Sequence, residues 1–111
     1  MAIYFKTETP NKLLNTFKKA IDDGHIRTWA YDEAGDFTHT ADQWNKKAWL
    51  RPEVRDKTAL AFFIIKPEGV KISSEVYAIY HGRFIESMVR HCDTLFTNGS
   101  ATAMPEGRDT V

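Results

Sequence analysis

The segment 77–92, YAIYHGRFIESMVRHC, contains the side chains best suited to chemistry. Histidine titrates near neutral pH, so His81 is a candidate general acid or base. Tyr77 precedes it by one helical turn and would hold its second ring nitrogen, with Tyr80 beside them. Aromatic residues of segment 25–40 would complete a ligand-binding cup. The predicted cup consists of Trp29, Tyr31, His39, Tyr77, Tyr80 and His81.

A structural role competes with this chemistry. If 77–92 is helical, His81 and His91 both fall in its apolar half, where a histidine is often partly buried with one nitrogen bonded to a carbonyl. The two rings would lie about 15 Å apart along the axis, too far to share a metal ion. We therefore favour a core role for both histidines, and the sequence predicts no metal site and no cofactor.

A second candidate site is basic and lies in segment 46–57. Basic side chains interleaved with tryptophans are typical of proteins that bind single-stranded nucleic acid. The residues concerned are Trp44, Lys46, Lys47, Trp49, Arg51, Arg55 and Lys57. However, 15 basic and 15 acidic residues give the chain a net charge of zero, so no long-range field supports such binding. We therefore do not expect a nucleic-acid partner, and we expect the tryptophans to turn inwards.

The segment 25–40, HIRTWAYDEAGDFTHT, predicts a β-hairpin. Two alternating runs flank DEAG, in which Gly35 suits a tight loop. The register would pair Asp32 with Asp36, Tyr31 with Phe37 and Trp29 with His39. Two carboxylates would then face each other at the tip, which we expect to be solvated rather than to bind a cation.

Two helices are expected to position these residues. The first, at about 10–23, begins where Thr9–Pro10 suits a helix start, and Gly24 suits its end. Its apolar side chains recur at helical spacing. The second, at about 74–96, begins after a serine that can cap it and stops before Asn98–Gly99.

The clearest strand is TALAFFIIK, residues 58–66, which is apolar on both faces and is therefore expected at the centre of a sheet. Shorter strands are expected at 2–7, in the hairpin and near 100–104. The segment 41–48 is ambiguous: Thr40 and Gln43 have capping-box spacing, which favours a short helix over a strand beginning near Lys47.

These elements predict an α+β fold with a mainly antiparallel sheet of four or five strands. The long C-terminal helix would pack on one face, and the shorter N-terminal helix would share that face or cover the other. Residues 1–104 are expected to form a single domain, with 105–111 as a loose tail. Because two helices would leave part of a doubly apolar strand uncovered, we hypothesise a homodimer that buries the second face.

The composition of the chain and the absence of certain motifs exclude several classes of function. Cys92 is the only cysteine, no apolar run approaches the roughly 20 residues that span a bilayer, and the first residues do not resemble a secretory signal. No phosphate-binding glycine loop, nucleophile elbow or dinucleotide fingerprint occurs. We expect a small cytoplasmic, non-catalytic binding or accessory protein that acts through protein–protein contacts, with itself or another protein as partner and no membrane. The alternatives are a small enzyme or ligand cup using His81, and single-stranded nucleic-acid binding through 46–57.

Overall fold

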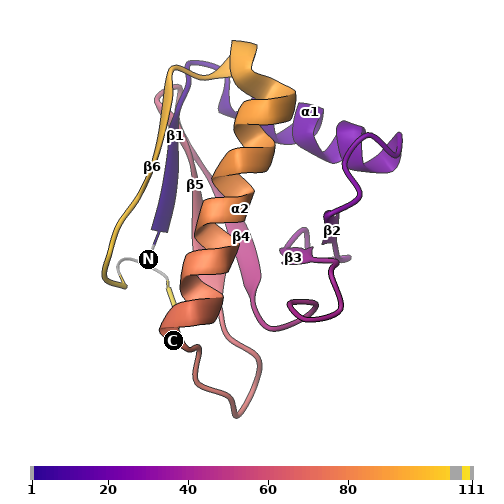
Figure 1. Cartoon of the computed structure of the whole chain (residues 1–111). Coiled ribbons are helices and arrows are strands. Elements are labelled where there is room, and N and C mark those ends of the chain that lie inside the picture. Colours follow the sequence, from indigo (N-terminus) through magenta and orange to yellow (C-terminus); the bar gives the residue numbers. More distant parts are fainter. Residues whose placement is uncertain (1, 106–108, 111) are drawn as a thin grey trace.

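The computed structural model describes residues 2–105 and 109–110, which form one sheet and two helices (Figure 1). The elements are β1 Ala2–Lys6, α1 Pro10–Asp22, β2 Trp29–Tyr31, β3 Phe37–His39, β4 Trp49–Arg55, β5 Ala59–Ile65, α2 Ser74–Cys92, a 3-10 turn Asp93–Leu95 and β6 Asn98–Ala101. Every strand pairing is antiparallel, in the order β2-β3-β4-β5-β1-β6. The predicted α+β fold is confirmed, with six strands in place of four or five.

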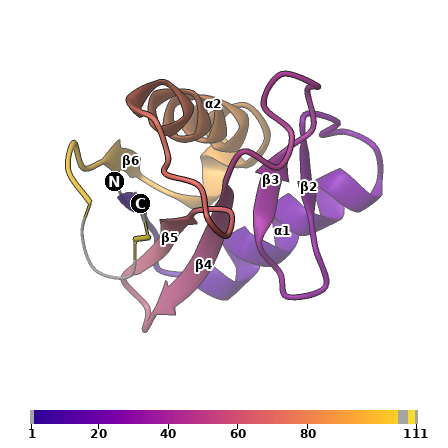
Figure 2. The ribbon, with the colours of Figure 1, turned by 90° about the horizontal axis from the view of Figure 1, so that it is seen from below.

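The two helices lie on the same face of the sheet. Phe17 of α1 contacts Phe84 of α2 at a centroid distance of 5.0 Å and Phe37 of β3 at 5.6 Å, so one core joins both helices to the strands. Viewed along the strands, the sheet runs from β6 at one end to the β2–β3 hairpin at the other (Figure 2). The helix expected at 10–23 therefore shares its face with the long C-terminal helix.

Both helix starts follow their local sequence. Pro10 occupies the first position of α1, where its missing N–H costs nothing. Thr9 is the N-cap, but its side chain makes no capping hydrogen bond. Gly24 follows the helix with φ +79°, a backbone angle that favours glycine. In α2 the Ser73 hydroxyl accepts a hydrogen bond from the Val76 N–H at 3.2 Å, as expected for a capping serine.

The hairpin register predicted from the sequence is confirmed. Trp29 pairs with His39, and Tyr31 with Phe37. At the tip, the Asp32 N–H donates to the Asp36 carbonyl at 3.0 Å. The loop has a positive φ at Gly35, as the turn requires.

The short helix predicted for 41–48 is wrong. The Trp44 and Asn45 N–H groups both donate to the Ala41 carbonyl, but the chain then turns at Lys46, whose φ of +58° ends any helical continuation. Trp44 is buried, which holds this pair of turns against the core. Strand β4 begins directly afterwards at Trp49, close to the start of the alternative strand.

The second face of β5 is buried within the chain itself. Ala61 and Phe63 are fully buried there together with Ala2. The Tyr4 ring meets Phe63 edge-on at 6.3 Å, and the Arg55 guanidinium lies over both rings at 5.2 and 5.4 Å. The apolar pattern that suggested a dimer through this face is thus accounted for without a second copy.

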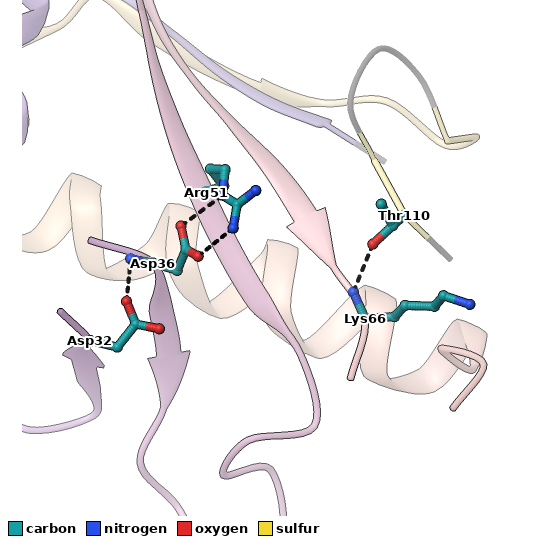
Figure 3. Close-up of polar contacts among 5 residues, drawn as sticks. All are labelled: Asp32, Asp36, Arg51, Lys66 and Thr110. Carbon is teal, nitrogen blue, oxygen red and sulfur yellow. Dashed lines mark hydrogen bonds and ion pairs between the residues drawn. The ribbon is translucent and has the colours of Figure 1, made fainter. Parts of the chain in front are cut away.

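Residues 109–110 bond to β5 on the same side as β1, beyond the point where β1 ends. Strand β1 pairs with β5 no further than Phe63. Beyond that point the Ile64 N–H donates to Asp109 Oδ1 at 2.8 Å, and the Thr110 N–H donates to the Ile64 carbonyl at 2.8 Å. The Lys66 N–H donates to Thr110 Oγ1 at 2.9 Å (Figure 3). The expected loose tail at 105–111 includes 106–108 and 111, which lie outside the described residues. Residues 109–110 are bonded to the sheet.

Gly99 is required by the packing of β6 on β1. It pairs with Phe5, and a Cβ added to it would lie 2.9 Å from two atoms of that fully buried ring. The ring also contacts Phe62, Phe84 and Phe96, so it has little freedom to move. We expect Gly99→Ala to lower the free energy of unfolding by about 1–3 kcal/mol, measured by urea denaturation.

Gly82→Ala is the matched control. This glycine lies within α2, and a Cβ there would meet no atom within 4 Å. The substitution should raise the unfolding free energy by about 0.5–1 kcal/mol, because alanine favours helix. If both variants shift stability in the same direction, the close approach of Gly99 to Phe5 is not the cause.

Candidate functional site

Three residues of the predicted cup come together between α2 and the hairpin. The Trp29 ring lies 5.0 Å from the His39 ring and 5.5 Å from the Tyr80 ring, both in edge-to-face geometry. All three side chains are buried. Trp29 also meets Phe84 at 4.9 Å, which joins the cluster to the main core.

The Tyr80 hydroxyl joins α2 to the residues around β3. It donates to the Trp44 carbonyl, it accepts from the His39 N–H at 3.4 Å, and its oxygen lies 3.0 Å from Thr38 Oγ1. Thr38 Oγ1 in turn donates to the Ala48 carbonyl and accepts from the Lys46 N–H. The arrangement is a buried polar network that holds the 41–48 turns against α2. Thr38 was not among the residues predicted for this site, because a threonine in a short strand carries no distinctive signal in the sequence.

His81 is 2% exposed, and its ring is held within its own helix. Its Nδ1 lies 2.6 Å from the Tyr77 carbonyl oxygen and donates to it. Tyr77 thus holds one nitrogen of His81, as expected, but through its backbone rather than its hydroxyl. The Tyr77 hydroxyl is buried and has no hydrogen-bond partner among the described residues. By contrast, His91 is exposed, so of the two histidines only His81 lies in the core.

Tyr31 is not part of this cluster. Its hydroxyl donates to Asp22 Oδ1 at 2.7 Å, and Lys18 lies 5.3 Å from the centre of its ring. The hydrogen bond to Asp22 raises the pKa of Tyr31. The tyrosine therefore ties the hairpin to α1, and its ring packs against Phe37 at 5.8 Å.

A cavity of about 190 Å³ adjoins the cluster between α2 and β2–β3. It is lined by Thr28, Trp29, His39, Arg83, Glu86 and Ser87. Of the predicted cup residues, only Trp29 and His39 reach it. The His39 Nδ1 accepts a hydrogen bond from the Ala41 N–H at 3.1 Å. Burial, assisted by the charge of Arg83, lowers the pKa of His39, so the ring is neutral at pH 7.

The acidic hairpin tip and the basic stretch meet at Arg51. Its guanidinium makes two hydrogen bonds to the Asp36 carboxylate, at 3.1 and 2.8 Å, and the Asp36 N–H donates to Asp32 Oδ1 at 2.9 Å (Figure 3). Arg51 thereby supplies the cation that two facing carboxylates need.

The other residues of the basic stretch differ in their burial and in their ion pairs. Arg55 pairs with Glu53 at 3.2 Å, and Trp44 is turned into the core with 8% exposure. Trp49 is half-buried, and Lys46 and Lys47 are exposed in the turns before β4. The structure therefore leaves no exposed pair of tryptophans beside these basic groups.

A second hollow, larger than the cavity beside His39, lies at the other end of the sheet. This groove of about 590 Å³ is lined by Lys6, Thr7, Glu8, Thr9, Lys57, Thr58, Thr94, Leu95, Phe96 and Thr97. It adjoins β6, the edge strand, in which all four residues are exposed. Strand β6 pairs with β1 on one side, and no described strand pairs with its other side.

Cys92 is a core residue. Burial raises the pKa of its thiol to about 11, so it is protonated at pH 7 and is not a ready nucleophile.

Among residues 2–105 and 109–110, neither helix combines the length and the apolarity that crossing a bilayer requires.

The fold and these surfaces define a small α+β domain with a free sheet edge, an adjoining groove and a separate small cavity beside His39. Comparisons of the chain with protein-family models, with curated proteins and with solved structures find no match.

Proposed function

We propose that this protein is a non-catalytic binding protein that acts through protein–protein contacts, and that a second copy of the chain pairs with it along β6. The observation that carries the proposal is the exposure of all four residues of this edge strand, Asn98–Ala101. An edge strand presents unpaired N–H and C=O groups that another strand can satisfy.

The two edges of the sheet differ in protection. Proteins usually guard an edge with lysine, proline, a short strand or a covering element. At the opposite edge β2 has only three residues, and Tyr31 is tied to Asp22 of α1. Strand β6, with the sequence NGSA, is also short at four residues, but it has neither a charged residue nor a proline. The contrast supports β6 as the edge that receives a partner.

The backbone register shows which groups a partner would meet. The Thr102 N–H donates to the Ala2 carbonyl, so that pair is of the hydrogen-bonded type. Hydrogen-bonded and non-hydrogen-bonded pairs alternate along antiparallel strands. Ser100 therefore turns its backbone groups towards β1, while Gly99 and Ala101 turn theirs outwards.

A second copy suits this edge. Two β6 strands placed antiparallel across a two-fold axis present the same groups to each other, as an isologous interface requires. Neither strand carries a charge, and the chain as a whole is neutral, so like-charge repulsion does not oppose the approach. The wall of the neighbouring groove carries positive charges from Lys6 and Lys57 and a negative charge from Glu8. A two-fold axis can place the positive groups of one copy opposite the negative group of the other.

The alternatives receive less support. An enzyme using His81 would need that ring to reach a reactant, but it is almost fully buried and does not line either hollow described above. Of the five basic residues in 46–57, Arg51 and Arg55 are paired with carboxylates, and the neighbouring Trp44 is buried, which weakens the case for nucleic-acid binding there. A cytoplasmic location remains part of the proposal and rests on the single cysteine, Cys92.

Ala101→Pro tests the proposal. Proline at this position removes an outward N–H and leaves the β1 side of the ladder intact. We expect the wild-type protein to sediment as a dimer and the variant as a monomer with nearly unchanged thermal unfolding. Ser100→Pro is the control, because it removes an inward N–H and should lower stability.

Two results would contradict self-association through β6. One is a wild-type protein that sediments as a monomer at the highest concentration reached. The other is a dimer of Ala101→Pro as tight as that of the wild type, which would place the contact elsewhere.

A further inference from the structure

The cavity beside His39 is separate from the proposed β6 contact. It lies between the middle of α2 and the β2–β3 hairpin, at the end of the sheet opposite β6. Its volume of about 190 Å³ is below the roughly 300–1,000 Å³ typical of sites for drug-sized ligands. A group of a few heavy atoms fits such a space.

His39 offers a hydrogen-bond donor to this cavity. Its Nδ1 accepts from the Ala41 N–H, so the proton of the neutral ring is on Nε2. The ring is fixed by this bond and by its contact with Trp29 at 5.0 Å. A neutral imidazole with a fixed tautomer is a donor of defined direction.

Trp29 lines the same cavity and has an unsatisfied indole N–H close to it. The residue lines the cavity and is 1% exposed, yet its Nε1 has no hydrogen-bond partner among the described residues. Indole N–H can only donate, so its missing partner must be an acceptor. The nitrogen itself has almost no accessible surface, so the indole N–H lies beside the cavity and does not donate into it.

The remaining wall adds a positive charge and hydroxyl groups. Arg83 is exposed at the rim, and Ser87 and Thr28 contribute side-chain hydroxyls. Glu86 is the one carboxylate on the wall, and within the described part of the chain it forms no ion pair with Arg83. Donors therefore outnumber acceptors around this space.

We infer that the cavity lined by Trp29, His39 and Arg83 binds a small oxyanion group, of the carboxylate or phosphate kind, which accepts from the His39 imidazole N–H and pairs with the Arg83 guanidinium. Charge-assisted hydrogen bonds of this type are the strongest that a short-range polar site can offer. The size of the cavity limits the bound part to the anionic group itself.

The Trp29 indole N–H signal in a proton–nitrogen correlation spectrum reports on this site, because Trp29 lines the cavity. Inorganic phosphate and acetate are titrated separately, with sodium chloride at equal ionic strength as reference, and Trp29→Phe assigns the signal. We expect a saturable shift of this signal with at least one of the two anions, while the Trp44 and Trp49 signals stay in place. The anion that shifts it identifies the bound group.

Arg83→Gln should weaken this binding by about tenfold or more, because one charge-assisted contact is lost. Arg90→Gln is the matched control, since Arg90 is exposed on the same helix and does not line the cavity. Both variants should fold, because both side chains are exposed. The inference is overturned if neither anion shifts the Trp29 signal beyond the effect of sodium chloride, or if Arg83→Gln binds as well as Arg90→Gln.

Discussion

Phe84→Ala is expected to lower the free energy of unfolding by about 3–5 kcal/mol, the range for removing a fully buried phenylalanine ring. Five aromatic rings surround Phe84. They are Phe62 at 4.6 Å, Trp29 at 4.9 Å, Phe17 at 5.0 Å, Phe37 at 5.7 Å and Phe5 at 6.3 Å. Because these rings come from α1 and from four of the strands, the cavity left by alanine cannot collapse locally.

The measurement is urea denaturation followed by circular dichroism. A small domain has a total stability of about 5–15 kcal/mol, so this loss would unfold a marginal protein or shift the midpoint strongly. Val89→Ala on the same helix is the control, since Val89 is 49% exposed and its loss should change stability by less than about 0.5 kcal/mol. Similar midpoints for the two variants would mean that Phe84 is not at the centre of the core.

Some of the fold was predictable because local rules decide it. The β2–β3 register follows from the position of Gly35 and from alternation along two short runs. The first residues of α1 and α2 follow from Pro10 and from the capping serine Ser73. In each case the residue that decides the structure lies within a few positions of it.

Strand β4 was not among the predicted strands because its sequence lacks the alternating, β-favouring pattern of a typical strand. The strand reads WLRPEVR, in which a proline and three charged residues resemble a loop. Its neighbour β3 pairs with it only at Leu50, which leaves Pro52 and the following residues at a free side of the strand. A proline is acceptable at such an edge, but only the tertiary pairing with β5 shows that the edge exists.

The candidate site was predictable in part. Alternation and helical spacing placed Trp29, His39 and Tyr80 on facing surfaces, and the structure brings these three together. The partners of the Tyr80 hydroxyl were not predictable, because Trp44 and Thr38 lie 36 and 42 residues away in sequence and no periodic pattern connects them. The cavity residue Arg83 was missed for a related reason: it lies on the polar half of α2, where the sequence suggests only solvent.

Tyr80→Phe is expected to lower the free energy of unfolding by about 1–3 kcal/mol, although the ring and its contacts remain. The loss arises because the hydroxyl is buried and is the donor to the Trp44 carbonyl. Without it, that carbonyl keeps only the bond from the Lys47 N–H at 3.2 Å, and the buried His39 N–H loses its acceptor. Thr38 Oγ1 is affected less, since it keeps its bonds to the Ala48 carbonyl and the Lys46 N–H.

Tyr31→Phe separates this effect from the general loss of a tyrosine hydroxyl. The Tyr31 hydroxyl bonds to Asp22 at the surface, so removing it should cost less than about 0.5 kcal/mol. Amide hydrogen exchange gives a second readout. The His39 N–H donates to the Tyr80 oxygen at 3.4 Å and should exchange faster in Tyr80→Phe alone, while the amides of β5 change only as global stability does. If both variants lose equally little stability and the His39 amide keeps its protection, the hydroxyl of Tyr80 does not hold α2 to β3, and the shape of the cavity beside His39 must depend on ring packing alone.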